Sequence, residues 1–342
     1  MVEKVATVQD VARVAGVSAA TVSRALSRPT KVTEATRELV AEAVKQTGYR
    51  VNRAARNLRT RRTDSVLVLL PDLANPFFSS ILEGIAEPLE KRGISMLVSG
   101  SERVKSGAEK LIDYFEDGRA DGLLALDGTI GAPALTNIID SPYSNRIVFA
   151  CEWPEFGSFS GVRSENAEGA ALAIRHLHTL GHRRIGYVAG PAENVLNRAR
   201  RDGVTAELNK LGIPLNEKWD LPGDFSLEAG AQAANAWLSM SDRPTAIFCS
   251  SDILAIGLIS ELSRRGISVP DDLSVVGFDD IEIAERFIPS LTTIRQDRQK
   301  LGEVAGQMLV DQLSPDDVTS ACQSVSIPVS LIERDSCAPI SD

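Results

Sequence analysis

Long apolar runs and secretion signals are lacking in this chain of 342 residues. No stretch approaches the roughly 18–20 consecutive apolar residues that a membrane-spanning helix needs. The first ten residues, MVEKVATVQD, contain no apolar segment of the kind found at the centre of a secretory signal. We therefore expect a cytoplasmic protein that has no contact with a membrane.

The chain has few cysteines, and they lie far apart in the sequence. The four cysteines form no C-x-x-C pair (Cys151, Cys249, Cys322 and Cys337). Neither a disulfide framework nor a structural metal is expected from such spacing. We predict that these residues are buried as small hydrophobic side chains.

Catalytic motifs are lacking as well. The chain contains no G-x-S-x-G, no phosphate-binding loop of the nucleotide-hydrolase type and no H-E-x-x-H. His178 and His182 lie four residues apart, a spacing compatible with a metal on a helix. However, Gly181 is expected to end that helix, and no carboxylate or cysteine supports the pair. We expect no enzyme activity, no metal site and no cofactor.

What the chain does have is a strongly uneven charge distribution. Residues 1–62 hold 13 basic and 5 acidic residues, a net charge of +8, while the remainder carries −17. The hydrophobic content of 43% is ordinary for a globular protein, and the length is enough for two or three domains. A basic segment on an acidic body is typical of a phosphate-binding module joined to a body that repels DNA.

The basic segment opens with two short helical patterns, TVQDVARVAGVSAATVSRALSR, at residues 7–28. The first places Val8, Val11, Ala12 and Ala15 on one face. The second begins after Ser18, a good N-cap, and presents residues 22, 25 and 26 to a core. Gly16 lets the two helices meet at a steep angle. This is the pattern of a helix-turn-helix, whose second helix lies in the DNA major groove.

A third helical pattern and an arginine-rich segment follow. Thr33 is a plausible N-cap for a helix over residues 34–47, in which Leu39, Val40, Ala43 and Val44 can close a three-helix core. Gly48 suits the helix exit. Residues 49–63 then carry six arginines and few apolar anchors. Alone this segment is too short and self-repelling to be a stable helix, but against DNA phosphates it could become one.

From Ser65 onward, strand and helix patterns alternate. Such alternation gives parallel sheets with helices on both faces, and ligands bind beyond the carboxyl ends of the strands. Two consecutive series predict two similar lobes. The predicted strands are residues 65–71, 94–100, 121–126, 146–151, 183–191, 245–251 and 273–280, and the predicted helices are residues 76–92, 105–117, 167–180, 195–211, 227–239 and 253–265.

Several segments make the chain resemble the lactose-repressor (LacI/GalR) family of bacterial transcription factors. They are VQDVARVAGVSAATVSRAL, VTEATRELVAEAVKQTGY, NRAARNLR, LGHRRIGYVAGP, DDLSVVGFDD and PSLTTIRQD. The resemblance implies an all-α helix-turn-helix head on an α/β core of the periplasmic-binding-protein type, with two parallel, doubly wound sheets. The implied ranges are a head at 1–48, a hinge at 49–63, an N-terminal lobe at 64–161 with 293–324, and a C-terminal lobe at 162–292 with 325–342. Three crossovers would join the lobes near residues 161–163, 290–293 and 324–327.

The resemblance also implies a set of DNA contacts. Ala19, Ala20 and Arg24 match positions that face base edges, and the Arg24 fork suits O6 and N7 of a guanine. Small hydroxyls suited to phosphates are Thr7, Ser18, Thr21, Ser23, Thr33 and Thr36. In the hinge, Leu58 matches a leucine that wedges between base pairs in the minor groove, and Asn52 and Ala55 match neighbouring contacts.

Strand ends and the family pattern together predict the ligand-binding residues. They are Phe77, Phe78, Glu152, Trp153, Asn197, Arg200, Phe225, Ser251, Asp279 and Gln296. Carboxylates and arginine bind vicinal hydroxyls, and aromatic faces stack on sugar rings, so we expect a sugar or glycoside. A nucleoside or purine is the alternative, disfavoured because Leu196 stands where purine-binding relatives have a polar group. Arg298 occupies a position that is aromatic in some sugar-responsive relatives, which leaves the size and identity of the ligand open.

These observations predict a homodimeric repressor that a sugar releases from a palindromic operator of a carbohydrate operon. A corepressor would use the same architecture with the opposite sign. A sugar-binding receptor without a regulatory role is a rival for the body, but the attached head and the lack of a signal argue against it. No leucine heptads follow residue 327, so we expect a dimer rather than a tetramer.

Overall fold

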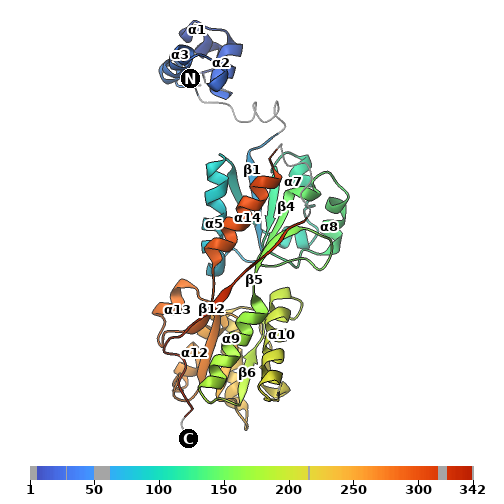
Figure 1. The fold of residues 1–342 in the computed structure, drawn as a ribbon, viewed down its shortest axis with the longest axis vertical. Coiled ribbons are helices and arrows are strands. Elements are labelled where there is room, and N and C mark those ends of the chain that lie inside the picture. The colour runs from blue at the N-terminus through green and yellow to red at the C-terminus, as the bar shows by residue number, and fades with distance from the viewer. Residues whose placement is uncertain (1–5, 28, 50–61, 215, 315–321, 341–342) are drawn as a thin grey trace. The chain divides into compact units, whose positions relative to one another are not determined.

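The computed structural model describes residues 6–27, 29–49, 62–214, 216–314 and 322–340. The chain forms two compact units, Met1–Thr63 and Asp64–Asp342. The first unit contains α1 (Val8–Ala15), α2 (Ala19–Ser27), the 3-10 turn η1 (Pro29–Lys31) and α3 (Glu34–Thr47), as Figure 1 shows. The predicted helix-turn-helix and third helix are therefore confirmed. The proposed hinge contacts Asn52, Ala55 and Leu58 lie outside the described residues.

Local sequence signals set the helix ends of the head. Thr7 and Asp10 cap α1 reciprocally, and the Thr33 side chain accepts a hydrogen bond from the Thr36 amide at the start of α3. Gly16 and Gly48 both adopt a left-handed φ of 66°, which ends α1 and α3 at little steric cost. The turn between α1 and α2 therefore depends on Gly16.

The core of the head is smaller than its sequence suggested. Its buried hydrophobic residues are Val11, Ala12, Val22, Ala25, Val40 and Ala43. Leu26 and Leu39 were expected in this core, but they are 38% and 55% exposed. Leu26 follows the buried Ala25, and Leu39 precedes the buried Val40. A step of one residue rotates a side chain by about 100° around the helix axis, so both leucines point away from the core. Three short helices bury only one narrow stripe each.

The second unit contains two six-stranded sheets. The sheet of the first lobe is entirely parallel, in the order β11-β5-β4-β3-β1-β2. Its strands are β1 (Ser65–Leu70), β2 (Ser95–Gly100), β3 (Gly122–Ala125), β4 (Ile147–Ala150), β5 (Ser160–Ser164) and β11 (Ser324–Ile327). Its helical elements are η2 (Pro76–Phe78), α5 (Ser79–Lys91), α6 (Glu102–Lys105), α7 (Asp113–Glu116), α8 (Ala132–Ile139), η3 (Ser144–Arg146) and α14 (Arg298–Gln312).

The helices of the first lobe differ from the sequence prediction at three places, one of which is α14, a helix that the sequence analysis did not predict. The single helix expected over residues 105–117 is two short helices, α6 and α7, because Gly107 adopts a left-handed φ of 74° between them. The helix α8 was not predicted. It begins with Pro133 in its first turn and follows Gly131, both of which are compatible with a helix start.

The sheet of the second lobe has the order β12-β10-β9-β8-β6-β7. Its strands are β6 (Ile185–Val188), β7 (Asp220–Leu221), β8 (Ala246–Cys249), β9 (Ser274–Asp279), β10 (Thr292–Gln296) and β12 (Val329–Ile332). Its helical elements are α9 (Asn166–Thr179), α10 (Val195–Lys210), η4 (Glu217–Trp219), α11 (Leu227–Ser239), α12 (Asp252–Arg264) and α13 (Glu282–Arg286). The edge strand β12 pairs antiparallel with β10, so this sheet is mixed rather than wholly parallel.

The crossovers between the lobes lie a few residues later than predicted. The chain leaves the first sheet after β5, returns after β10 and crosses again between β11 and β12, which puts the crossings near residues 165, 297 and 328. The strand β10 therefore belongs to the second lobe, although the range 293–324 had assigned it to the first. Each strand runs to its end within one sheet before the chain changes lobe, because only a sheet neighbour satisfies its backbone hydrogen bonds.

The cysteines and histidines occupy mostly structural positions. Cys151 and Cys249 are buried as predicted and Cys337 is half-buried, but Cys322 is exposed. His182 is buried and bonds the hydroxyls of Thr245, just before β8, and of Ser274, the first residue of β9. Among the described residues, no cluster of histidine, cysteine and acidic side chains could hold a metal, and no helix is long and apolar enough to cross a membrane.

Candidate functional site

The outer face of α2 in the head carries the residues predicted to contact DNA bases. Ala19, Ala20 and Arg24 are all exposed, and the Arg24 Nε donates to the Ala20 carbonyl at 3.3 Å. Ser18 precedes the helix, and its hydroxyl accepts from the Thr21 amide at 3.1 Å. The helix therefore presents one long cationic side chain beside two methyl groups.

Five of the six predicted phosphate-binding hydroxyls lie at or near helix starts, and the sixth, Ser23, lies in the middle of α2. Thr7, Ser18 and Thr33 are exposed, while Thr21, Ser23 and Thr36 are half-buried. The Ser18 and Thr21 hydroxyls are 2.9 Å apart, and those of Thr33 and Thr36 are 2.8 Å apart. Hydroxyls paired at a helix N-terminus, together with free amides there, are suited to phosphate oxygens.

A cavity of about 700 Å³ lies between the two lobes of the second unit. It sits beyond the carboxyl ends of β1, β4, β8 and β9, as expected for ligand sites in parallel sheets. Seven of the predicted ligand residues line it, namely Phe77, Phe78, Glu152, Arg200, Phe225, Ser251 and Asp279. Its volume is in the range of small-molecule sites.

Three predicted ligand residues are not among those that line the cavity. The Trp153 ring faces the Arg163 guanidinium, at 4.9 Å from its centroid. The Asn197 carbonyl oxygen accepts from the Gly190 amide at 2.9 Å and from the Tyr187 hydroxyl at 3.1 Å. Gln296 donates to Asp279 at 2.7 Å. Gln296 therefore holds the lining residue Asp279 from behind the cavity wall, whereas the Trp153 ring packs on Arg163, which does not line the cavity.

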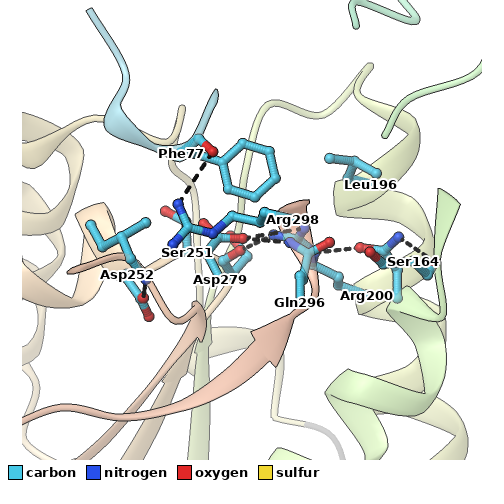
Figure 2. Close-up of polar contacts among 12 residues, drawn as sticks. Phe77, Ser164, Leu196, Arg200, Ser251, Asp252, Asp279, Gln296 and Arg298 are labelled. Carbon is cyan, nitrogen blue, oxygen red and sulfur yellow. Dashed lines mark hydrogen bonds and ion pairs between the residues drawn. The ribbon is translucent and has the colours of Figure 1, made fainter. Parts of the chain in front are cut away.

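Arg200, on α10, is a fully buried cation at the cavity wall, with an exposure of 2%. Its Nε donates to Asn166 at 2.9 Å, its Nη1 donates to the Ser250 carbonyl, and its Nη2 lies 3.7 Å from an Asp279 oxygen. The guanidinium also lies 3.8 Å from the Phe278 ring centroid. Burial lowers the pKa of Arg200, and the nearby Asp279 carboxylate opposes that shift. Figure 2 shows Arg200 beside Asp279 and Gln296.

Asp279, the last residue of β9, is held by its neighbours in an uncommon backbone conformation. Burial raises its pKa to about 6, whereas Arg200 and the Gln296 hydrogen bond lower it. Its φ is 122°, and the cavity residues Cys151 and Phe225 also have left-handed φ angles, of 67° and 65°. Such conformations are costly for residues other than glycine and cluster at binding sites.

Asp252 supports Asp279 from within the second lobe. Its carboxylate accepts from the Thr293 hydroxyl at 2.5 Å and from the Ile281 amide at 2.9 Å. Burial raises the pKa of Asp252, and the charge of Asp279 raises it further. The Asp252 side chain thereby ties α12 to β10 and to the segment after β9.

Two contacts join the lobes across or behind the cavity. Glu152, after β4, accepts from the Gly128 amide and from the Asn194 side chain of the second lobe, both at 2.8 Å. Burial raises the pKa of Glu152 to about 6, and these two hydrogen bonds oppose the shift. Arg298, at the start of α14, donates to the Phe77 carbonyl at 3.3 Å and to the Asp280 carbonyl at 3.0 Å. Figure 2 shows the Arg298 side chain reaching Phe77.

The predicted ligand residues leave out six charged residues that line the cavity, namely Asp72, Lys105, Asp127, Glu193, Asp224 and Glu228. Asp127 accepts from the Ser101 hydroxyl and from the Thr129 amide, the latter at 2.8 Å, and Lys105 lies 3.5 Å from it. Asp127 follows the predicted strand 121–126 within one residue, so the strand-end rule would have found it. No sequence signal pointed to Lys105, whose helix was not predicted correctly.

Two family models match the chain. The model described as "Bacterial regulatory proteins, lacI family" matches residues 7–52, and a "Periplasmic binding protein-like domain" matches residues 174–337. The HTH-type transcriptional repressor CytR of Escherichia coli (strain K12) is 36% identical over 318 residues, which are 93% of this chain and 93% of CytR.

Two solved structures share the fold over nearly the whole chain. A Lac repressor dimer bound to operator and the anti-inducer ONPF has a TM-score of 0.82 and 29% identity, covering 98% of this chain and 100% of that one. A complex of the transcriptional regulator CelR with cellobiose has a TM-score of 0.72 and 28% identity, covering 97% and 99%. The similarity therefore extends over the head and both lobes.

Proposed function

Since the chain belongs to the LacI family of bacterial regulatory proteins, we propose that it is a homodimeric repressor released from a palindromic operator by a sugar or glycoside. The relative CytR is a transcriptional repressor. A protein with this function acts in the cytoplasm, where the operator is. The observation that carries the sugar assignment is the cavity wall that combines Arg200 and Asp279 with phenylalanine rings.

The head supports operator binding through a single strong base reader. Arg24 is exposed on α2, and its neighbours Ala19 and Ala20 offer only methyl contacts. The net charge of +8 over residues 1–62 supplies the attraction to phosphates. Because Ala19 and Ala20 cannot form hydrogen bonds to bases through their side chains, we expect Arg24 to account for most of the specificity in the major groove.

Arg24→Lys tests base reading separately from charge. The lysine keeps the positive charge but loses the bidentate fork, so we expect specific operator affinity to fall about 10- to 100-fold. Affinity for unrelated DNA should change little at the same salt concentration. Fluorescence anisotropy with operator and scrambled duplexes measures both. An equal loss on the two duplexes would show that Arg24 contacts only phosphates.

Exposed apolar side chains support the homodimer. Leu97 and Val98 are exposed on β2, an edge strand of the first sheet, and Leu73 is exposed after β1. An unpaired apolar edge of this kind is a liability unless a partner covers it, and we propose that a second copy does so. A two-fold dimer then presents two heads to a two-fold operator. Sedimentation of Leu97→Lys should show monomers, while Thr136→Lys on the exposed face of α8 should stay dimeric.

The chemistry of the cavity supports a hydroxyl-rich effector. Glu152, Asp279 and Arg200 can bond vicinal hydroxyls, and the rings of Phe77 and Phe225 can stack on the apolar face of a sugar. The cellobiose complex of CelR shows that this fold binds a sugar. A nucleoside is the alternative, because the same rings can stack on a base. Leu196 lines the cavity and offers a base no hydrogen bond.

The cleft gives the effector a means to control the head. A ligand between the lobes changes the contacts of Glu152 with Asn194 and of Arg298 with Phe77 and Asp280, which join the two lobes. The head connects to the first lobe just before β1, so a change in lobe geometry alters the spacing of the two hinges in a dimer. The effect is limited to the difference in ligand affinity between the two states. A corepressor would act through the same contacts with the opposite sign.

A thermal-shift screen of sugars, glycosides and nucleosides tests the effector class. We expect a sugar to raise the melting temperature and to lower operator affinity. Asp279→Asn should abolish the shift, whereas Trp153→Phe, whose side chain does not line the cavity, should preserve it. A response to nucleosides alone would contradict the sugar assignment. A ligand that strengthens operator binding would show that it is a corepressor.

A further inference from the structure

The ionisable side chains that line the cavity are mostly acidic. Seven carboxylates line it against two cations, Lys105 and Arg200, which gives a formal charge of −5 on the wall. The carboxylates are Asp72, Asp127, Glu152, Glu193, Asp224, Glu228 and Asp279. A cleft lined by charges of one sign concentrates the field within it, because its low-dielectric walls screen poorly.

Both cations of the wall already have an acidic partner. Lys105 lies 3.5 Å from Asp127, which is itself buried. Arg200 lies 3.7 Å from Asp279, and its other nitrogens donate to Asn166 and to the Ser250 carbonyl. An anionic group in the cavity would therefore have to displace or share a carboxylate to reach either cation. Among the described residues that line the cavity, there is no further cation.

Four of the carboxylates are exposed where the cavity meets solvent, and we name them the acidic rim: Asp72, Glu193, Asp224 and Glu228. The hydrogen bonds that hold three of them come from uncharged donors. Asp72 accepts from the Ala74 amide at 2.8 Å, Asp224 from the Ser226 amide at 3.0 Å and Glu228 from the Gln232 side chain at 3.2 Å. Such donors fix the carboxylates in place without cancelling their charge.

We propose that this cavity excludes phosphorylated compounds and accepts the effector only in an uncharged or cationic form. The proposal rests on the proposed function in that it concerns the same cavity, and it holds for a sugar and for a nucleoside alike. A phosphate monoester carries close to two negative charges at neutral pH. The carboxylates of the acidic rim would repel such an ester as it enters. Inside the cavity it would find only cations, Lys105 and Arg200, that are already paired with carboxylates. The free sugar or nucleoside meets hydrogen-bond acceptors and donors without that repulsion.

Charged thiol reagents measure the cavity field without any effector. In full-length protein carrying Cys322→Ser and Cys151→Ala, which removes the native thiol of the cavity wall, the Ala74→Cys thiol would line the cavity, and the Thr136→Cys thiol on exposed α8 is the matched control. We expect the rate ratio of a cationic to an anionic methanethiosulfonate to be at least tenfold higher at the Ala74→Cys site. The excess should shrink in 0.5 M salt and in the variant with all four rim carboxylates changed to amides. Equal ratios at the two sites would overturn the proposal.

Paired ligands test the consequence for recognition. Calorimetry compares cellobiose with cellobiose 6′-phosphate and adenosine with its 5′-monophosphate, at low salt. We expect each ester to bind at least tenfold more weakly than its parent, which corresponds to about 1.4 kcal/mol, and the rim variant to narrow the gap. An ester that binds as tightly as its parent would overturn the proposal. If no parent or ester binds, neither cellobiose nor adenosine is the effector, and the reagent rates alone decide the charge proposal.

Discussion

The two lobes contribute to the same cavity in different ways. In the second lobe, Arg200 and Asp279 are buried and held by partners from that lobe, among them Asn166, Ser250 and Gln296. In the first lobe, Glu152 takes one of its two hydrogen bonds from Asn194 across the cavity. The second lobe therefore orients its ligand-binding side chains through its own contacts. In the first lobe, Glu152 has both of its hydrogen bonds only when the two lobes are in contact.

The largest effect is expected from the substitution Arg200→Met, which tests this difference between the lobes. The substitution leaves Asp279 buried without its cation, and breaking a buried pair in this way costs about 3–5 kcal/mol. We expect urea unfolding at pH 7.5 to show a loss of that size and effector binding to disappear.

A second substitution separates lost charge pairing from lost packing. In Arg200→Met with Asp279→Asn, no unpaired carboxylate remains, so most of the stability should return while effector binding stays absent. A double variant as unstable as the single one would show that Arg200 acts mainly by filling space against Phe278, and the ready-made charge network of the second lobe would be refuted.

A middle-sized effect is expected from the pH dependence of Glu152 in the first lobe. Burial raises the pKa of Glu152 from an ordinary 4.5 to about 6, so the folded state binds this proton more tightly than the unfolded chain. The contribution of Glu152 to the free energy of unfolding is therefore most favourable below pH 4.5, and it becomes less favourable as the pH rises through 6. The change is about 2 kcal/mol, at 1.36 kcal/mol per pKa unit.

Comparison with Glu152→Gln isolates that contribution. The difference in unfolding free energy between wild type and Glu152→Gln should vary by about 1.5 kcal/mol from pH 4.5 to 6.5 and level off above about pH 7.5. Asn194→Ala removes a hydrogen bond that lowers this pKa, so it should move the transition to higher pH. A pH profile unchanged by Asn194→Ala would show that the first lobe does not depend on the second for this group.

Local patterns predicted much of the fold because strand and helix periods are local. Thr33 and Gly48 mark the ends of α3, and the strand-end rule placed Ser251 and Asp279 at the cavity. The same rule failed for Trp153. Trp153 directly follows the lining residues Cys151 and Glu152, but its ring packs on Arg163 instead, because no strand period fixes side-chain directions in the irregular segment after β4.

Contacts between the lobes could not be predicted from sequence in this way. Glu152 and Asn194 are 42 positions apart and belong to different sheets, so no periodicity relates them. The crossovers were misplaced by a few residues for a related reason. Where β10 ends depends on its pairing with β9 and β12, which is a property of the assembled sheet.

The smallest expected effect concerns a third contact between the lobes, from Arg198 on α10 to Glu155 after β4. Their side chains are 39% and 72% exposed, so solvent screens the pair, and such pairs contribute about 0.2–1 kcal/mol. We expect a double-mutant cycle of Arg198→Gln and Glu155→Gln to give a coupling near the lower limit, vanishing in 0.5 M salt. The pair Arg184–Asp242, within the second lobe and similarly exposed, is the matched control. A coupling well above that of the control would show that charge at the surface, and not the buried Glu152–Asn194 bond, holds the first lobe against the second.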